Sequence, residues 1–559
     1  MQKYAHPTLN RLIDQSAEAY PELPAVGFAF ETALTYQEFH QKILLTAAQL
    51  KKIGIKKGDR LAILAENSPQ WGIAYFAIVR LGAVAVPILP DFTESDVKHI
   101  INEAKIKILF TTQKQFEKLY ELNLTGLKSV IALDDAPDQN RIITPTPFSK
   151  FLAEPLPEQA ADNNDDALLT AEDTASIIYT SGTSGHSKAV ILTHNNFTNN
   201  VRSTEAIFAG ESIDNWTFLS ILPMSHAYEF TISFLTPLAN GCRIVYAGQT
   251  PTPTILEKIC KTEQPNIMCM VPMVIEKIYK KKILPAINNS IILKTAIKIP
   301  LLRKKVLRKI GKNLCNFFGG KLKIAAIGGA PLNIEVEHFL KDAGFPYLVG
   351  YGLTEASPLI SAGPYGDDIP VGSCGKPILN LEVKIVHPNP KTGVGEVYAR
   401  GQNIMAGYMN NQEATAETIT ADGWLATGDL GFIDQAGYLF LKGRSKSVIV
   451  LSHGENIYPE TIEDKINSFQ QVVESLVVEC NNRLEARVFL DYDLIDQKTK
   501  GKNQQEKLSY INEILADIKK NVNDNLPQYS KISEIMEHQE PFIKTATHKI
   551  KRYLYYGAN

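Results

Sequence analysis

Short apolar runs alternate with longer stretches of helix-like apolar spacing along most of the chain. The β-type runs are Leu61–Leu64, Ala83–Ile88, Ile106–Phe110, Phe218–Leu222, Arg243–Tyr246, Ile267–Val271 and Lys323–Ile327. Alternation of this kind is typical of layered α/β structure with largely parallel sheets. We therefore predict an α/β fold built from several such layers.

The longest apolar stretch runs from Trp71 to Pro90 and could be mistaken for a membrane span. Arg80, Gly82 and Pro87 interrupt it, whereas a spanning helix needs about 20 predominantly apolar residues in succession. A buried helix over residues 70–81, followed by a strand over residues 83–88, explains the pattern better. We expect both elements to lie in the core.

The pattern changes after residue 444. Short strands follow, together with a helix near Pro459–Ser468 and a polar loop at Asp496–Lys507. We predict a large N-terminal domain of residues 1–445 and a small, mobile α+β C-terminal domain of residues 446–559.

Composition narrows the class of protein. The chain has 559 residues, too many for one ordinary core, and its 44% hydrophobic and 21% charged residues are those of a soluble globular protein. A net charge of −2 gives no general attraction to nucleic acid. Six scattered cysteines and an N-terminus without an apolar signal segment predict a cytoplasmic location. The sequence assigns no oligomeric state.

A loop rich in Gly, Ser and Thr lies between two β-type runs and ends in Lys188. Its glycines permit tight turns, and its hydroxyl and N–H groups can surround a phosphate. A Walker-type loop fails on spacing, because Gly-Lys-Ser/Thr must come in succession before a helix. A plain surface loop is the alternative. The candidate phosphate ligands are Thr180, Ser181, Gly182, Thr183, Ser184, Gly185 and Lys188.

Six further motifs follow in order. They are Leu222–Phe230 (LPMSHAYEF), Gly328–Leu332 (GGAPL), Gly350–Glu355 (GYGLTE), Leu425–Asp429 (LATGD), Gly443–Lys446 (GRSK, followed by GEN and PETIE), and Lys544–Arg552 (KTATHKIKR). With the loop, they resemble the signatures of the adenylate-forming, or AMP-binding, superfamily, and most specifically those of its bacterial long-chain fatty acid–CoA ligases. Ser187, Ala189 and His548 depart from the usual residues.

This resemblance implies a site for ATP, Mg²⁺ and a carboxylic acid. Two anions must meet there, so cations have to neutralise charge as pyrophosphate leaves. The expected catalytic residues are Lys188, Thr354, Glu355 and Lys549, with Glu355 and Thr354 at the metal and Lys549 between the acid and the α-phosphate. The expected nucleotide contacts are Asp429 and Arg444 at the ribose, Tyr351 on adenine, and Gly329, Ala330 and Gly352 beside it.

The resemblance also implies a second step, in which the thiol of coenzyme A attacks the acyl-adenylate. Lys549 must then leave the site. In the superfamily the C-terminal domain rotates about a hinge, which falls here on Lys446. The loop containing Gly454 would move in and leave room for the pantetheine arm.

The acid itself is less well specified by the motifs. Gly352 leaves open a position where acetate-activating relatives carry Trp, which favours a longer acid. His226 and Phe230 are candidate acid-pocket residues, and Phe230 is a candidate gate of an acyl tunnel. A core histidine and a core aromatic are the respective alternatives.

Three functions are compatible with these motifs. The first is a long-chain fatty acid–CoA ligase. The second performs the same adenylation and delivers the acyl group to an acyl carrier protein. The third, a catalytically silent acyl- or nucleotide-binding protein, is disfavoured because Lys188, Glu355 and Lys549 are all present.

A basic segment, residues 277–312, contains twelve Lys or Arg residues, and no acidic residue occurs from residue 277 to residue 334. Leu302, Val306 and Ile310 form a helical stripe within it. Such a helix can rest on the anionic inner face of a membrane. A solvated surface helix, or a docking face for a carrier protein, are the alternatives.

Overall fold

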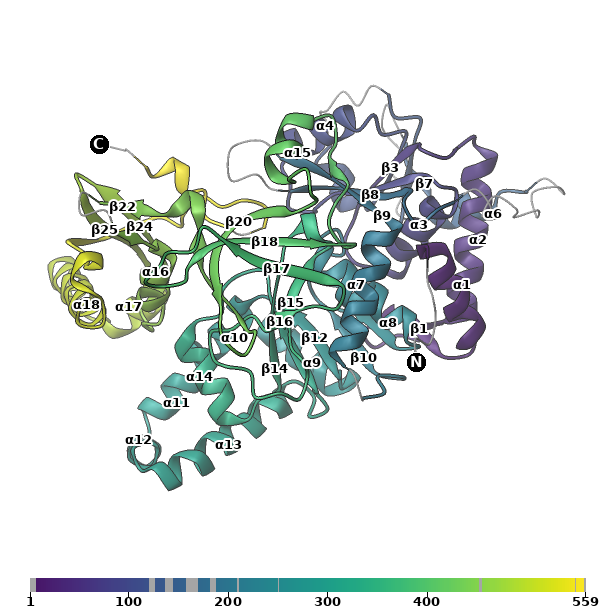
Figure 1. Ribbon diagram of the computed structural model, residues 1–559. Helices are drawn as coiled ribbons and strands as arrows, with labels where there is room; N and C mark the ends of the chain where they lie inside the picture. Colours follow the sequence, from purple (N-terminus) through teal and green to yellow (C-terminus); the bar gives the residue numbers. More distant parts are fainter. Residues whose placement is uncertain are drawn as a thin grey trace.

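The computed structural model describes residues 7–119, 126–135, 144–156, 169–180, 187–208, 211–249, 251–451, 455–547 and 549–556. Two large sheets dominate it, and a smaller unit lies to one side of them (Figure 1). The mixed α/β architecture with largely parallel sheets confirms the predicted fold class.

One large sheet has eight strands and is parallel except at one edge. At this edge β9 runs antiparallel to both of its neighbours, β8 and β19, and β8 and β9 form the hairpin that contains the phosphate loop. The order across the sheet is β19 (Gly407–Tyr408), β9 (Lys188–Thr193), β8 (Thr174–Thr180), β4 (Val84–Pro87), β3 (Arg60–Leu64), β5 (Ile108–Thr111), β6 (Ser129–Ala132) and β7 (Thr146–Pro147).

The second large sheet has nine strands and is parallel from β14 to β1. Antiparallel strands close its two edges. The order is β16 (Lys376–Pro377), β15 (Leu359–Ala362), β14 (Tyr347–Gly352), β13 (Ile324–Ile327), β12 (Ile267–Met270), β10 (Thr217–Ser220), β11 (Arg243–Tyr246), β1 (Pro24–Phe28) and β2 (Leu34–Thr35).

The helices described before residue 445 surround these sheets or project from them. They are α1 (Leu9–Ala19), α2 (Tyr36–Lys52), α3 (Pro69–Arg80), α4 (Glu94–Glu103), α5 (Gln113–Glu117), α6 (Phe148–Ala153), α7 (His194–Ile207), α8 (Thr236–Ala239), α9 (Pro253–Glu263), α10 (Pro272–Ile278), α11 (Leu284–Asn288), α12 (Ile291–Lys298), α13 (Pro300–Phe317), α14 (Ile334–Ala343) and α15 (Gln412–Thr418). Shorter π or 3₁₀ turns are η3 (Glu229–Leu235), η4 (Tyr279–Ile283) and η5 (Thr354–Ala356).

Helix α3 is the apolar helix predicted from the Trp71–Pro90 stretch, and it lies in the core. Ser68 caps its first turn by accepting a hydrogen bond from the backbone N–H of Trp71, and Pro69 occupies the first helical position. Side chains of α3 belong to a hydrophobic core cluster that also contains side chains of both large sheets, including Ile63 and Tyr246. Among the described residues, no helix is both long and apolar enough to cross a bilayer.

A four-stranded antiparallel sheet connects the large sheets to the C-terminal part of the chain. Its strands are β17 (Leu381–Val386), β18 (Gly395–Gly401), β20 (Leu425–Ile433) and β21 (Leu439–Arg444). Strand β21 ends immediately before the short turn η6 (Ser445–Ser447), which contains the proposed hinge.

Residues 446–559, which we call the C-terminal unit, have a core of their own. It extends from Ile449 to Ile532 and contains no residue of the large sheets. The elements of this unit are β22 (Ile449–Val450), β23 (Asn456–Ile457), α16 (Pro459–Asn467), β24 (Val472–Cys480), β25 (Arg483–Leu490), α17 (Tyr492–Lys498), α18 (Gln504–Asp524), η7 (Gln528–Ser530), β26 (Glu534–Glu537) and η8 (Arg552–Leu554).

The predicted polar loop at Asp496–Lys507 was largely wrong. Helix α17 extends to Lys498, and α18 begins at Gln504. A capping box explains the early start of α18, because Asn503 and Glu506 each accept a hydrogen bond from the other's backbone N–H. Polar composition had masked this capping signal.

Candidate functional site

The proposed phosphate loop joins two paired antiparallel strands. Thr180 ends β8 and lies opposite Lys188, the first residue of β9. Residues 181–186 lie outside the described residues, so the candidates Ser181, Gly182, Thr183, Ser184 and Gly185 have no structural description. The Lys188 ammonium lies 4.4 Å from the centre of the Tyr408 ring. A cation–π contact therefore holds the loop's lysine near the edge of the sheet.

Tyr408 connects this lysine to the predicted metal ligand. Its hydroxyl donates a hydrogen bond to Glu355 Oε1 at 2.9 Å. Pairing of β19 with β9 places Tyr408 beside Val190, two residues after Lys188. Our sequence analysis missed Tyr408, since it lies in none of the motifs and only strand pairing brings it to the site.

The carboxylate of Asp429 has a protein partner on each oxygen. The Tyr351 hydroxyl donates to Oδ2 at 2.7 Å, and Arg444 Nε lies 3.2 Å from Oδ1. Asp429 and Arg444 are direct cross-strand neighbours in β20 and β21, and Tyr351 comes from β14. The structure thus brings together three of the predicted nucleotide-binding residues.

Two ion pairs anchor the hairpin that carries Lys549. Lys544 pairs with Glu474, and Arg552 pairs with the buried Glu463. Lys544 and Ile550 form an antiparallel β-bridge, which closes the hairpin between these two ion pairs. The outer cations of the motif therefore fix its two ends, and Lys549 lies between them.

Lys549 lies close to the charges of the large domain. It retains solvent exposure, but desolvation by the surrounding protein atoms lowers its pKa. The positive charge of Arg444 lowers this pKa further, while Asp429 and Glu355 oppose the shift. Desolvation, together with the charge of Lys549, also lowers the pKa of His226 to about 4. Five predicted site residues from five separate motifs thus form one electrostatic cluster.

The turn after β13 has the geometry expected on the adenine side. Gly329 adopts φ +84°, a conformation that favours glycine, and both Gly329 and Ala330 are exposed. A Cβ on Gly328 would lie 3.3 Å from the ring of Tyr228. This exposed turn follows β13, which pairs with β14, the strand that carries Tyr351.

The packing around Gly352 weakens the argument that its small size indicates a longer acid. A Cβ added there would lie 2.0 Å from the carbonyl oxygen of Pro358, which belongs to the backbone. Any side chain at this position would therefore require the backbone to move. Glycine is explained by this close approach, so it carries no independent information about chain length.

Phe230 lies among aromatic side chains rather than at an open surface. Its ring centroid is 4.4 Å from that of Tyr75, 5.1 Å from that of Phe197 and 5.9 Å from that of Trp71. Only 2% of its surface is exposed. These contacts fit the core alternative, and a gating role stays a prediction.

Glu229, beside Phe230, is fully buried, and this burial raises its pKa to about 8. Because the ordinary value is 4.5, the folded protein binds this proton more tightly than the unfolded chain does. Stability is therefore expected to fall as pH rises from about 4.5 to about 8.

Glu229→Gln removes this titration. We expect the variant to melt about 2–5 °C above the wild type at pH 8, and within about 1 °C of it near pH 4, in thermal scans. Exposed Glu540 supplies a matched control, Glu540→Gln, which should change neither midpoint. A wild-type advantage at pH 8 would contradict the assignment of a neutral Glu229.

The oxygen donors suit a Mg²⁺ ion that is held mainly by phosphate. No group of three or more His, Cys, Asp or Glu side chains forms a metal cluster in the part of the chain that the structure describes. Glu355 and Thr354 lie together in η5, and Tyr408 engages only one of the Glu355 oxygens. Mg²⁺ commonly binds through one or two carboxylates plus phosphate oxygens, so this sparse set fits it.

Polar contacts join the C-terminal unit to the large domain. Lys280 donates to the carbonyl oxygens of Asn467 and Val472, the second at 3.2 Å. The Asn333 amide donates to Asp464 Oδ1 at 2.8 Å, and Lys281 pairs with Asp491 at 3.3 Å. These contacts hold the C-terminal unit in the arrangement that brings Lys549 near Asp429, Glu355 and Arg444.

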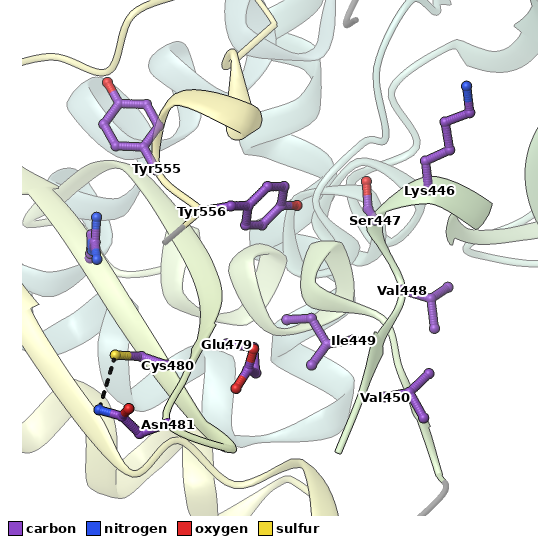
Figure 2. A pocket seen from close by; sticks show the side chains of 11 residues that line it. Lys446, Ser447, Val448, Ile449, Val450, Glu479, Cys480, Asn481, Tyr555 and Tyr556 are labelled. Atoms are coloured by element: carbon purple, nitrogen blue, oxygen red, sulfur yellow. Dashed lines mark hydrogen bonds between the residues drawn. The ribbon is translucent and has the colours of Figure 1, made fainter. Parts of the chain in front are cut away.

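The proposed hinge is exposed and borders a cavity. Lys446 lies in η6, and residues 446–450 line one side of a cavity of about 400 Å³ (Figure 2). Tyr555, Tyr556 and residues 479–481 line the other sides. Gly454 lies outside the described residues.

Comparison with known families matches nearly the whole chain. A family model described as AMP-binding enzyme matches residues 13–409. A second, described as AMP-binding enzyme C-terminal domain, matches residues 446–558.

Individual relatives agree with these matches. Long-chain-fatty-acid–CoA ligase FadD15 of Mycobacterium bovis is 30% identical over 477 residues, which cover 80% of this chain and 75% of that protein. Human long-chain-fatty-acid–CoA ligase ACSBG1 is 27% identical over 540 residues, covering 88% and 72%. The crystal structure of the anthranilate CoA ligase AuaEII with anthranoyl-AMP superimposes with a TM-score of 0.79 at 20% identity, covering 98% of this chain and 96% of that one.

Proposed function

Because this chain belongs to the family of AMP-binding enzymes, we propose that it activates a long-chain fatty acid with ATP and transfers the acyl group to coenzyme A. The carrying observation is that Tyr351 and Arg444 contact the carboxylate of Asp429. The charges of this group and of Glu355 act on Lys549, which comes from the C-terminal tail. The names of the relatives favour a fatty acid as substrate and coenzyme A as acceptor.

In the first half-reaction, the acid's carboxylate attacks the α-phosphate of ATP, and pyrophosphate leaves. Lys549 neutralises the two anions as they approach each other, and Lys188 binds the departing phosphates. Asp429 accepts hydrogen bonds from the ribose while Tyr351 and Arg444 hold its carboxylate in place. Mg²⁺, held by Glu355 beside Thr354, would supply further positive charge at the phosphates.

In the second half-reaction, the thiol of coenzyme A attacks the acyl carbonyl, AMP leaves, and a thioester forms. We place the boundary of the moving domain at residues 445 and 446, with Lys446 as the hinge. The turn η6 supports this assignment, because none of its residues is buried and rotation there breaks no core packing.

A product analysis tests the function. The purified protein is incubated with ATP, Mg²⁺ and acids of graded length, without a thiol, with coenzyme A, or with an acyl carrier protein. Mass spectrometry should find acyl-AMP and pyrophosphate without a thiol, and acyl-CoA with coenzyme A. If only the carrier protein were acylated, the acceptor would be the carrier protein rather than coenzyme A. If no acyl-adenylate formed, the proposed function would be rejected.

The lowered pKa of Lys549 predicts where the rate of adenylation falls on the alkaline limb of its pH profile. The protonated lysine is required, so adenylation should decline as pH rises through a pKa below the ordinary 10.5. Lys549→Arg keeps its charge and should move this limb to higher pH, even at a reduced rate. Measurement of pyrophosphate exchange against pH checks this. An unchanged alkaline limb in Lys549→Arg would assign the titration to another group.

A further inference from the structure

Helices α12 and α13 form a tip that stands away from the sheets. Figure 1 shows α12 at the outer end of this projection, beyond α13 and α14. Helix α13 packs on α14 and α9 through Leu307 and Leu314, both buried. Helix α12 has no buried residue. The fold therefore supports the base of the projection and leaves its end in contact with solvent.

Aliphatic side chains are concentrated at this end. Ile291 is 85% exposed and Ile292 is 80% exposed, while Ile299 and Leu302 are nearly half exposed. In contrast, Ile297 faces inward against the core cluster of α13 and α14. Single exposed aliphatic residues are common, but four within twelve residues on one tip make a patch that usually has a partner.

Unpaired positive charges surround these side chains. Arg303 pairs with Asp342 at 2.6 Å. Among the described residues, no acidic partner is found for the other exposed cations of the two helices, which are Lys294, Lys298, Lys304, Lys305, Arg308, Lys309 and Lys312. A surface with this composition suits a partner that is both negatively charged and apolar just below its charges.

From this juxtaposition we infer that the α12–α13 tip docks on a bilayer containing anionic lipid. The aliphatic side chains enter the headgroup region, and the lysines contact the lipid phosphates. A bilayer can deform around a projecting tip and so contact its aliphatic and its charged side chains together. Lys280 and Lys281 of the basic segment are excluded from this surface, because they contact the C-terminal unit.

Vesicle sedimentation of the full chain tests this inference without any substrate, so its outcome is separate from that of the proposed activity. The wild type should bind vesicles of equal parts phosphatidylglycerol and phosphatidylcholine at low salt, and should be released at high salt. Vesicles of phosphatidylcholine alone should bind weakly. Equal or absent binding to both vesicle types at low salt would overturn the inference.

Paired variants locate the surface. Lys304→Glu with Lys305→Glu should weaken binding about tenfold or more, and Ile291→Ser with Ile292→Ser about fivefold or more. Lys98→Glu with Lys391→Glu, at exposed lysines on other parts of the molecule, makes the same charge change and should bind as the wild type does. A control variant as weak as the α13 variant would overturn the inference.

Thermal melting separates lost binding from lost folding, since all four substituted tip residues are exposed. If the charge reversal unfolds the protein, Lys294→Gln with Lys298→Gln tests the same tip on α12. An acidic acyl carrier protein is run as a competing partner. If the tip variants lose carrier-protein binding but keep vesicle binding, the membrane assignment is wrong.

Discussion

Replacement of Lys549 by alanine is expected to slow acyl-adenylate formation by about a thousandfold. The ammonium lies near Asp429, Glu355 and Arg444, where the carboxylate and the α-phosphate would meet. Loss of one such electrostatic group typically costs a factor of about 10²–10³ in rate. Pyrophosphate exchange measures this half-reaction directly.

The second half-reaction provides the internal comparison. When acyl-AMP is supplied, Lys549→Ala should form acyl-CoA within about threefold of the wild-type rate, because Lys549 has left the site before the thiol arrives in the cycle that we propose. Lys551→Ala, in the same tail, is the matched control and should leave both half-reactions unchanged. Equal losses in both half-reactions would mean that Lys549 maintains the fold rather than the first step.

Replacement of Lys446 by proline is expected to spare pyrophosphate exchange and to lower thioester formation by about a hundredfold or more. Proline fixes φ near −65° and restricts the residue before it, so the backbone at 445 and 446 loses the freedom that rotation needs. The structure already has Lys549 near the first-step residues, so this arrangement does not require the hinge to turn.

Lys446→Ala separates backbone from charge. It removes the ammonium but leaves φ free, and should keep thioester formation within about threefold of the wild type. Both rates are measured with the same acid, the first by pyrophosphate exchange and the second by acyl-CoA release from supplied acyl-AMP. Comparable loss of the two activities in Lys446→Pro would contradict the hinge assignment.

Sequence reasoning was successful where a local pattern carries the information. The apolar stretch at Trp71 predicted α3, and the motif order identified Asp429, Arg444 and Lys549, which the structure brings together. It failed where long-range pairing decides. Tyr408 reaches Glu355 only through the pairing of β19 with β9.

Gly352 and the basic segment show a related limit of linear patterns. A small residue looks the same in a sequence whether it opens a pocket or accommodates a nearby backbone. The structure distinguishes these cases, because a Cβ added at Gly352 would lie 2.0 Å from the carbonyl oxygen of Pro358. Likewise, the basic segment reads as one run of cations. In three dimensions it divides into a part that contacts the C-terminal unit and a part that projects into solvent.

The polar character of the contacts around Lys280 and Asn333 has a consequence for the timing of the cycle. The core cluster of the C-terminal unit contains no residue of the large sheets, although Ala546 packs against one of their cores. Separating the unit from the large domain therefore breaks the polar contacts described above and this small apolar contact. Each hydrogen bond that breaks is replaced by one to water, at a net cost of about 1 kcal/mol. The free-energy difference between the two domain arrangements is then small. The relative affinity of each arrangement for the bound molecules therefore determines when the enzyme changes from making the adenylate to consuming it.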